Sequence, residues 1–273
     1  LEEAMAGKDV LVLAVPSPYT RSTAQKMAPY LKKGQIVVNV AKGVEEHTLM
    51  TLSQIIEEEL PEANVAVLSG PSHAEEVGKG LPTTCVVGAR TRQIAEYLQE
   101  IFMSPVFRVY TSPDVLGIEL GAALKNVIAL GVGISTGLGY GDNARAALIT
   151  RGIAEIARLG VAMGCNIHTF AGLAGIGDLI VTATSMHSRN NRAGILIGKG
   201  ESPEQAVKEV GMVVEGINAL PAAMELAAKY NVEMPIVQTV NAIVKEGMSA
   251  SDALRTLMDR NRKNEMPQGY ENI

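Results

Sequence analysis

Hydrophobic residues gather in short uninterrupted runs over the first 111 residues of the chain. The runs lie at 9–15, 35–41, 64–70, 83–89 and 107–112. The first four are apolar throughout, which is the pattern of strands covered on both faces. Stretches with helical periodicity separate them, at 19–32, 48–60, 72–78 and 91–103. Alternation of this kind predicts a mostly parallel sheet with right-handed crossovers.

The pattern changes after Ser112. Ser112-Pro113-Asp114 is a typical helix start, with serine as N-cap and proline in the first turn. No convincing strand follows, and helices are predicted at 114–137, 142–164, 166–173, 189–198, 202–211, 215–230, 235–247 and 251–258. The fold class is therefore α/β, with a parallel-sheet domain over 1–112 and an all-helical domain over 113–273.

Composition and charge argue against several classes of partner and site. A net charge of −5 argues against nucleic-acid or anionic-membrane partners, since both need a basic surface. The two cysteines, Cys85 and Cys165, form no disulfide framework or metal motif, which fits a reducing cytoplasm. Glu119 and Lys125 interrupt the long apolar run at 115–138, which predicts a buried core helix rather than a membrane span.

Ligands of open α/β sheets bind beyond the carboxyl ends of the strands. Ser17 follows the first run and forms either a simple turn or a backbone contact with a nucleotide. Lys42 follows the second, either solvated or directed into the crevice. After the third, Ser72 and Glu75 make a capping box, and the same helix start could also hold an anion.

Lys125 is the sharpest chemical candidate. At helical spacing it shares a face with small and apolar residues: Ile118, Gly121, Ala122, Ile128, Ala129 and Val132. Burial there would disfavour the charged amine and lower its pKa, as a general base requires. The alternative is a lysine that snorkels to a nearby surface.

Two later segments supply further candidates. Asp178 ends a glycine-rich apolar stretch, either as a helix cap or as the partner of a buried lysine. Ser188, Arg189 and Asn190 open a predicted helix, which suits a phosphate group or else forms a solvated loop. The four histidines show no ligand spacing, and no metal site is predicted. Gly131-Val132-Gly133 lies inside a predicted helix and is therefore not a dinucleotide fingerprint.

Together these segments resemble bacterial-type NAD(P)-dependent glycerol-3-phosphate dehydrogenases. The resemblance covers essentially the whole chain. It rests on AVPS (14–17), AKGVE (41–45), SGPSHAEE (69–76), the block at 107–152, GLAGIGDLIVTATSMHSRNNRAG (172–194), VVEG (213–216) and VEMPI (232–236).

The resemblance implies interconversion of sn-glycerol 3-phosphate and dihydroxyacetone phosphate with NAD or NADP, in the cytoplasm, for phospholipid synthesis. Lys125 would be the proton acceptor, and Lys42 would touch both substrate and cofactor. The other implied substrate contacts are Gly70, Ser72, Asp178, Ser188, Arg189 and Asn190. The other implied cofactor contacts are Ser17, Ala74, Arg189, Val213 and Glu215. A homodimer is expected for this fold.

The beginning of the chain departs from the family pattern. The G-x-G-x-x-G turn after the first strand is absent, so we expect an incomplete Rossmann-like domain and poor cofactor binding by the chain as given. Two alternatives remain open at this point. One is a β-hydroxyacid-type dehydrogenase, and the other is a non-catalytic remnant without the pyrophosphate loop.

Overall fold

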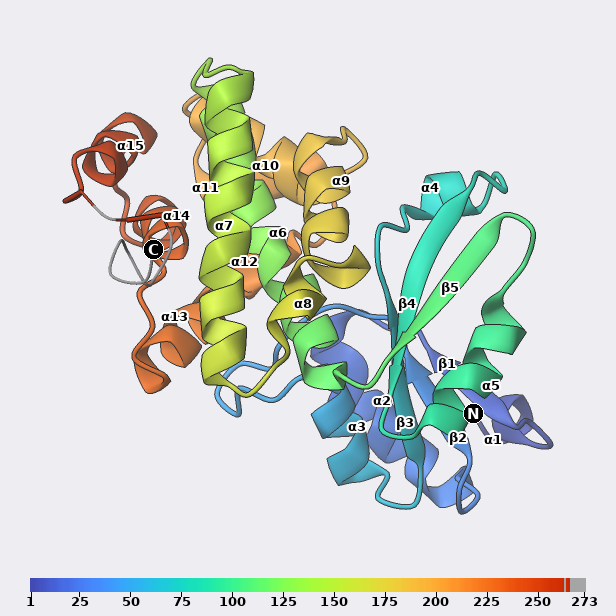
Figure 1. The fold of residues 1–273 in the computed structure, drawn as a ribbon. Helices are drawn as coiled ribbons and strands as arrows, with labels where there is room; N and C mark the ends of the chain where they lie inside the picture. The colour runs from blue at the N-terminus through green and yellow to red at the C-terminus, as the bar shows by residue number, and fades with distance from the viewer. Residues whose placement is uncertain (263, 266–273) are drawn as a thin grey trace, which may run out of the picture.

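The computed structural model describes residues 1–262, 264 and 265 (Figure 1). The strands are β1 (Val10–Leu13), β2 (Ile36–Asn39), β3 (Asn64–Ser69), β4 (Thr83–Ala89) and β5 (Phe107–Ser112). Within the described residues they form one sheet in the order β1-β2-β3-β4-β5. Each neighbouring pair is parallel except β3 and β4, which are antiparallel. The predicted mostly parallel sheet is confirmed.

Helices cover the sheet on both sides. On one face, α1 (Glu2–Met5), α2 (Thr20–Met27) and α3 (Leu52–Glu59) contribute Met27 and Ile56 to a core with Val37. On the other face, α5 (Arg92–Phe102) packs Leu98 against Val38. The remaining helix of this domain, α4 (Ala74–Val77), is a single turn after β3. Strand β1 is an edge strand, and Val12 is 51% exposed, so the expectation that β1 is covered on both faces was wrong.

The second domain is helical and is built around α6 (Val115–Gly137), whose residues 117–135 are all buried (Figure 1). Around it lie α7 (Asp142–Ala162), α8 (Ile167–Phe170), a π turn (Leu173–Gly177), α9 (Asp178–Thr184), α10 (Arg189–Gly198), α11 (Pro203–Val210), α12 (Glu215–Asn218), α13 (Leu220–Lys229), α14 (Pro235–Lys245) and α15 (Ala250–Met258). The N-cap of α6 is Asp114, which accepts from Gly117 N at 3.0 Å. The predicted serine cap was wrong, because Ser112 Oγ instead accepts from Asp114 N.

Glycines let α6 and α10 approach closely. An added Cβ at Gly133 would lie 2.3 Å from Asn191 O, and one at Gly194 would lie 2.2 Å from Leu130 O. Any larger residue would push the two backbones apart. Gly131 and Gly133 lie inside α6, as predicted; Gly133 faces α10, whereas an added Cβ at Gly131 would lie 2.9 Å from Val240 Cγ2 on α14. The contact also holds the start of α10 beside the middle of α6.

The structure differs from the sequence prediction at two further points. The segment after residue 173 was not predicted as helix, yet it forms the π turn and α9, with a break at Gly175. The helix predicted over 215–230 is divided into α12 and α13, and Pro221 lies in the first turn of α13. The first break places Asp178 at the start of α9.

Two stretches are long and apolar enough to cross a membrane by length and composition, Val115–Gly137 and Ile167–Thr184. The first is α6, and 89% of its most apolar window is buried inside the protein. The second is divided among α8, the π turn and α9. Burial of α6 agrees with the prediction of a core helix.

Candidate active site

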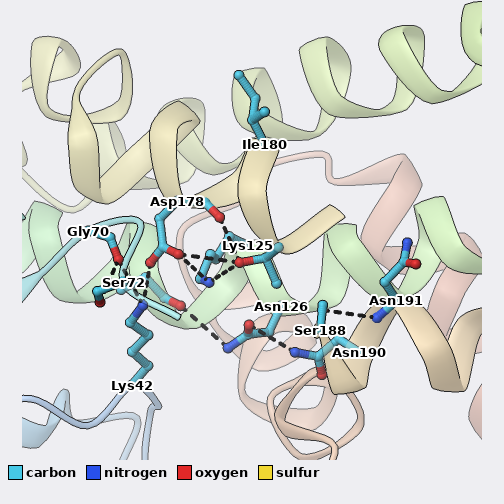
Figure 2. Close-up of polar contacts among 12 residues, drawn as sticks. Lys42, Gly70, Ser72, Lys125, Asn126, Asp178, Ile180, Ser188, Asn190 and Asn191 are labelled. Carbon is cyan, nitrogen blue, oxygen red and sulfur yellow. Dashed lines mark hydrogen bonds and ion pairs between the residues drawn. The ribbon is translucent and has the colours of Figure 1, made fainter. Parts of the chain in front are cut away.

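Asp178 accepts from two lysines that come from different domains (Figure 2). Lys125 Nζ, on α6, lies 2.6 Å from Asp178 Oδ1, and Lys42 Nζ, after β2, lies 2.5 Å from Oδ2. Asp178 and Lys125 are 1% and 3% exposed. The predicted desolvated lysine is therefore observed, and the alternative of a snorkelling side chain was wrong. Asp178 is its buried partner, as one of the two hypotheses for that residue held.

The electrostatics of this cluster are set by burial. Burial, together with repulsion from Lys42, lowers the pKa of Lys125 to about 7, although Asp178 acts in the opposite direction. Burial alone would raise the pKa of Asp178, but the two lysines outweigh it and hold that pKa below its usual value. Two ammonium groups share a single carboxylate, so the cluster is neutral when Lys125 is deprotonated.

Helix α9 presents a second group to the amine. Lys125 Nζ donates to Thr182 Oγ1, one turn beyond Asp178, and that hydroxyl donates to Asp178 O at 2.7 Å. Ile180, between them in sequence, points away from the cluster and is 48% exposed (Figure 2). Thr182 was missed in the sequence, although its spacing of four residues from Asp178 places both on one face of a helix.

Lys42 is steered by the turn after β3. Its Nζ donates to Gly70 O at 3.3 Å, and Ser72 Oγ donates to the same oxygen at 3.1 Å. Gly70 has φ +144°, and an added Cβ would lie 3.0 Å from Cys85 Cα, so only glycine fits there. The predicted capping box of Ser72 and Glu75 was wrong, because Ser72 turns back to Gly70 and His73 is the N-cap of α4.

A second polar group adjoins Lys125 on α6. Asn126, 5% exposed, accepts from Asn190 Nδ2 at 3.0 Å, and Asn190 Oδ1 accepts from Gly216 N at 2.7 Å. An added Cβ at Gly216 would lie 2.5 Å from Asn126 O, so α12 approaches α6 closely. Asn126 was also missed in the sequence, although it directly follows Lys125 in an apolar helix. These contacts bring the predicted Asn190 beside the lysine cluster.

The start of α10 has the features of an anion site. Ser188 is the N-cap and accepts from Asn191 N, as the sequence predicted for a helix start. Arg189 is half-buried, and its guanidinium makes no hydrogen bond or ion pair within the part of the chain that the structure describes. Across the domain boundary, Ser69 Oγ and His73 Nε2 are buried without a partner among the described residues. Free donors on both sides favour a polar ligand between them.

The residues expected to contact the dinucleotide fall into two groups. Ser17 Oγ donates to Glu215 Oε2 at 3.2 Å across the two domains, and Val213 is exposed just before Glu215. Burial raises the pKa of Glu215, although Ser17 acts in the opposite direction. Ala74 is exposed at the start of α4, beside Glu75. A hydrogen bond to its own backbone lowers the pKa of Glu75, and the positive charge of Arg189 also lowers it. Ser17 and Glu215 therefore meet, whereas Ala74 lies with Arg189.

A cavity of about 720 Å³ opens between β4, β5 and the segment from α8 to the π turn. Thr84, Tyr110, His168 and Gly177 are among its lining residues. Lys42, Lys125 and Asp178 are not among its lining residues, although Gly177 directly precedes Asp178.

Comparison with known proteins identifies the family. The model for the C-terminus of NAD-dependent glycerol-3-phosphate dehydrogenase matches residues 114–255, and the model for its N-terminus matches residues 1–95. The chain belongs to this family. The resemblance seen in the sequence is confirmed, and a β-hydroxyacid-type dehydrogenase is not the chain's family.

Individual relatives agree. Glycerol-3-phosphate dehydrogenase [NAD(P)+] of Fusobacterium nucleatum is 61% identical over 97% of this chain and 80% of that protein. The Moorella thermoacetica protein of the same name is 56% identical over 98% of this chain and 80% of its own length. The crystal structure of the Coxiella burnetii enzyme has a TM-score of 0.91 at 35% identity, and the match covers 95% of this chain and 80% of that one.

Proposed function

We propose that this chain catalyses the NAD(P)-dependent interconversion of sn-glycerol 3-phosphate and dihydroxyacetone phosphate, with Lys125 as general base. The observation that carries the proposal is the buried Lys125 amine held by Asp178 with its pKa lowered to about 7. A base is most effective when its pKa lies near the working pH. At neutral pH a large fraction of the amine is deprotonated and able to accept a proton.

The proton transfer follows from this geometry. In the oxidative direction the hydroxyl proton on carbon 2 of glycerol 3-phosphate passes to Lys125 Nζ, and carbon 2 becomes the ketone carbon of dihydroxyacetone phosphate. A bound nicotinamide cofactor would supply the acceptor for the hydride released from carbon 2. Asp178 stabilises the ammonium that forms on Lys125, and Thr182 orients the amine. In the reductive direction Lys125 returns the proton to the carbonyl oxygen.

The phosphate of the substrate would lie at the start of α10. Arg189 offers a planar fork of donors, and the first turn of the ten-residue helix α10 adds backbone N–H groups. His73 lies beside His187 near this region, and its Nε2 has no partner among the described residues; Ser72, in the same turn, is a further proposed substrate contact. Gly70, Ser188 and Asn190 complete the proposed substrate contacts. Lys42 would touch the substrate while it holds Asp178.

Ser17 and Glu215 fit the ribose side of a nicotinamide cofactor. A half-buried carboxylate and a serine hydroxyl are suited to sugar hydroxyls, and both groups lie at the carboxyl end of the sheet, where such cofactors bind. An added Cβ at Gly43 would lie 2.6 Å from Ser17 Cβ, so the Lys42–Gly43 turn closes tightly on this group. Val213, Lys42, Ala74 and Arg189 are the other proposed cofactor contacts. The cofactor is NAD or NADP.

Two further expectations are retained as proposals. A homodimer is expected because cyclic dimers are the commonest soluble oligomers. A cytoplasmic location is supported by Cys85 and Cys165, which are buried free thiols and not a disulfide.

The direct test is reduction of dihydroxyacetone phosphate by the full chain, with NADH and with NADPH. Lys125→Met keeps the length of the side chain and removes the base. We expect its turnover to fall by about 100- to 10,000-fold, because that is what a positioned general base contributes. Cofactor binding, followed by fluorescence titration, should persist. Near-normal turnover by Lys125→Met would contradict the assigned role, and oxidation of a non-phosphorylated hydroxy acid in place of glycerol 3-phosphate would contradict the substrate.

A further inference from the structure

Glu119 is a buried carboxyl group that the proposed reaction leaves without a role. It lies on α6, six residues before Lys125, and is 5% exposed. Its Oε1 accepts from Asn39 Nδ2 and from Ser53 N, each at 3.0 Å, and its Oε2 accepts from Ser53 Oγ at 2.5 Å. Burial raises the pKa of Glu119 against the effect of these bonds. A carboxyl group this deeply buried needs such partners to be retained.

The contact with Asn39 leads towards the catalytic cluster. Asn39 is the last residue of β2, and its side-chain amide bonds both backbone groups of Ala41. Nδ2 donates to Ala41 O at 3.1 Å, and Oδ1 accepts from Ala41 N at 3.0 Å. Lys42 follows directly, and its Nζ reaches Asp178. The amide of Asn39 therefore fixes the backbone from which Lys42 extends.

The contact with Ser53 leads elsewhere. Ser53 lies in the first turn of α3, and its N–H and hydroxyl both donate to Glu119. These hydrogen bonds join α6 to α3 and involve none of residues 39–42. Glu119 thus makes two separable contacts. Its contact with Ser53 anchors α3, and its contact with Asn39 holds the turn that carries Lys42.

We propose that Glu119 is a positioning residue that acts through Asn39 to hold Lys42 against Asp178. The inference rests on the proposed role of Lys125. Lys42 repels the protonated amine of Lys125 and occupies one oxygen of Asp178. Without the Glu119–Asn39 contact, Lys42 moves away from Asp178. Lys125 then has Asp178 to itself and is no longer repelled by Lys42, and both changes favour protonated Lys125. The base then becomes active only at higher pH.

The test compares four variants in the oxidation of glycerol 3-phosphate across the pH range. Glu119→Leu keeps most of the volume and removes the acceptor, and Asn39→Ala removes the Asn39 amide itself. For both we expect the acid limb of kcat/KM to move upward by about one pH unit, with kcat lowered about 10- to 100-fold. Glu119→Gln can still accept from Asn39 and should recover most of the activity with the wild-type limb.

Ser53→Ala is the matched control. It removes a contact of the same carboxyl group and leaves Asn39, Ala41 and Lys42 in place. Its thermal stability should fall while its pH limb stays at the wild-type position. A purely structural role for Glu119 predicts instead that Glu119→Leu, Asn39→Ala and Ser53→Ala lower stability and leave the limb unmoved, and that result would overturn the proposal. If Lys125→Met is active, the proposed function fails independently of this comparison.

Discussion

Lys125 Nζ lies 2.6 Å from Asp178 Oδ1, and both side chains are nearly completely buried. A buried lysine whose carboxylate partner is already engaged by a second lysine gains less from that partner than an isolated pair would. The excess positive charge makes the neutral amine accessible near neutral pH. The lowered pKa of Lys125 therefore depends on residues from distant parts of the chain, and Asp178 is common to both contacts.

Removal of the shared carboxylate should disable this arrangement. In Asp178→Asn, two lysines remain close together without a counter-charge, and Lys42 loses the partner that positions it. We expect kcat to fall by about 100-fold or more, since breaking one side of a buried ion pair is costly and displaces both amines. The control is Asp142→Asn, because the Asp142 side chain is 91% exposed and pairs with the nearby Arg145. Equal activities of the two variants in the steady-state assay would contradict the role of Asp178.

Arg189 should govern affinity for the phosphate. Arg189→Lys keeps the charge and loses the planar fork, so KM for glycerol 3-phosphate should rise about 10- to 100-fold with a smaller effect on kcat. Arg192→Lys, one turn further along α10 and exposed, is the matched control and should leave KM unchanged. Steady-state kinetics with both substrates distinguish the two variants. A similar KM in both would show that the start of α10 is not the phosphate site.

The packing of α6 on α10 predicts a local stability effect. In Gly133→Ala the new Cβ meets Asn191 O, so we expect the free energy of unfolding to fall by about 1–3 kcal/mol. In Gly141→Ala no atom lies within 4 Å of the added Cβ, and the effect should be small. Urea denaturation measures both changes. Equal stabilities would mean that the two helices are not in close contact.

Glu155 should make stability depend on pH. It is 2% exposed on α7 and accepts from Ile236 N at 2.8 Å, at the start of α14. Burial raises its pKa from 4.5 to about 7, against the opposing effect of these bonds. A raised pKa in the folded state means that the stabilisation is present at low pH and is lost as pH rises through about 7.

The variant Glu155→Gln removes this titration. Relative to it, the wild type should lose about 3 kcal/mol as the pH rises from about 4.5 to somewhat above 7. Urea unfolding of both proteins at the two pH values gives the comparison. A difference between the proteins that does not change with pH would contradict the assignment to Glu155.

The elements that the sequence predicted well are those with a strong local pattern. β3 and β4 could be predicted because their sequences are continuously apolar, as those of buried strands are. α6 could be predicted because its apolar run is long. The π turn and α9 were missed because glycines at 172, 175 and 177 interrupt helical periodicity. At the break, an added Cβ on Gly175 would lie 2.2 Å from Phe170 O, so the chain can turn back this closely on α8 only with glycine there.

The site residues differ in the same way: those with a local sequence signal could be predicted, and those that depend on long-range contacts could not. Lys125 could be identified because a charge in an apolar helix is a local anomaly. Asp178 links it to Lys42. Lys42 and Asp178 are 136 residues apart in the sequence, and only the fold brings them together. Ser72 is not a cap because α4 begins one residue later, with His73 as its N-cap, and the Ser72 hydroxyl donates back to Gly70 O. Glu119 interrupts the same apolar run as Lys125, yet its partners on β2 and α3 could not be predicted from spacing.

The role of Lys125 as the base is tested by the pH dependence of kcat in both directions of the reaction, with Lys125→Met as reference. Oxidation needs the neutral amine, so its rate should fall below a pKa of about 7, whereas reduction needs the ammonium, so its rate should fall above the same value. Ionisation of the substrate phosphate cannot produce such opposite limbs. Limbs of opposite direction near neutral pH, both absent in Lys125→Met, are the predicted result. Limbs of the same direction, or limbs that persist in Lys125→Met, would contradict the assignment of Lys125 as the base.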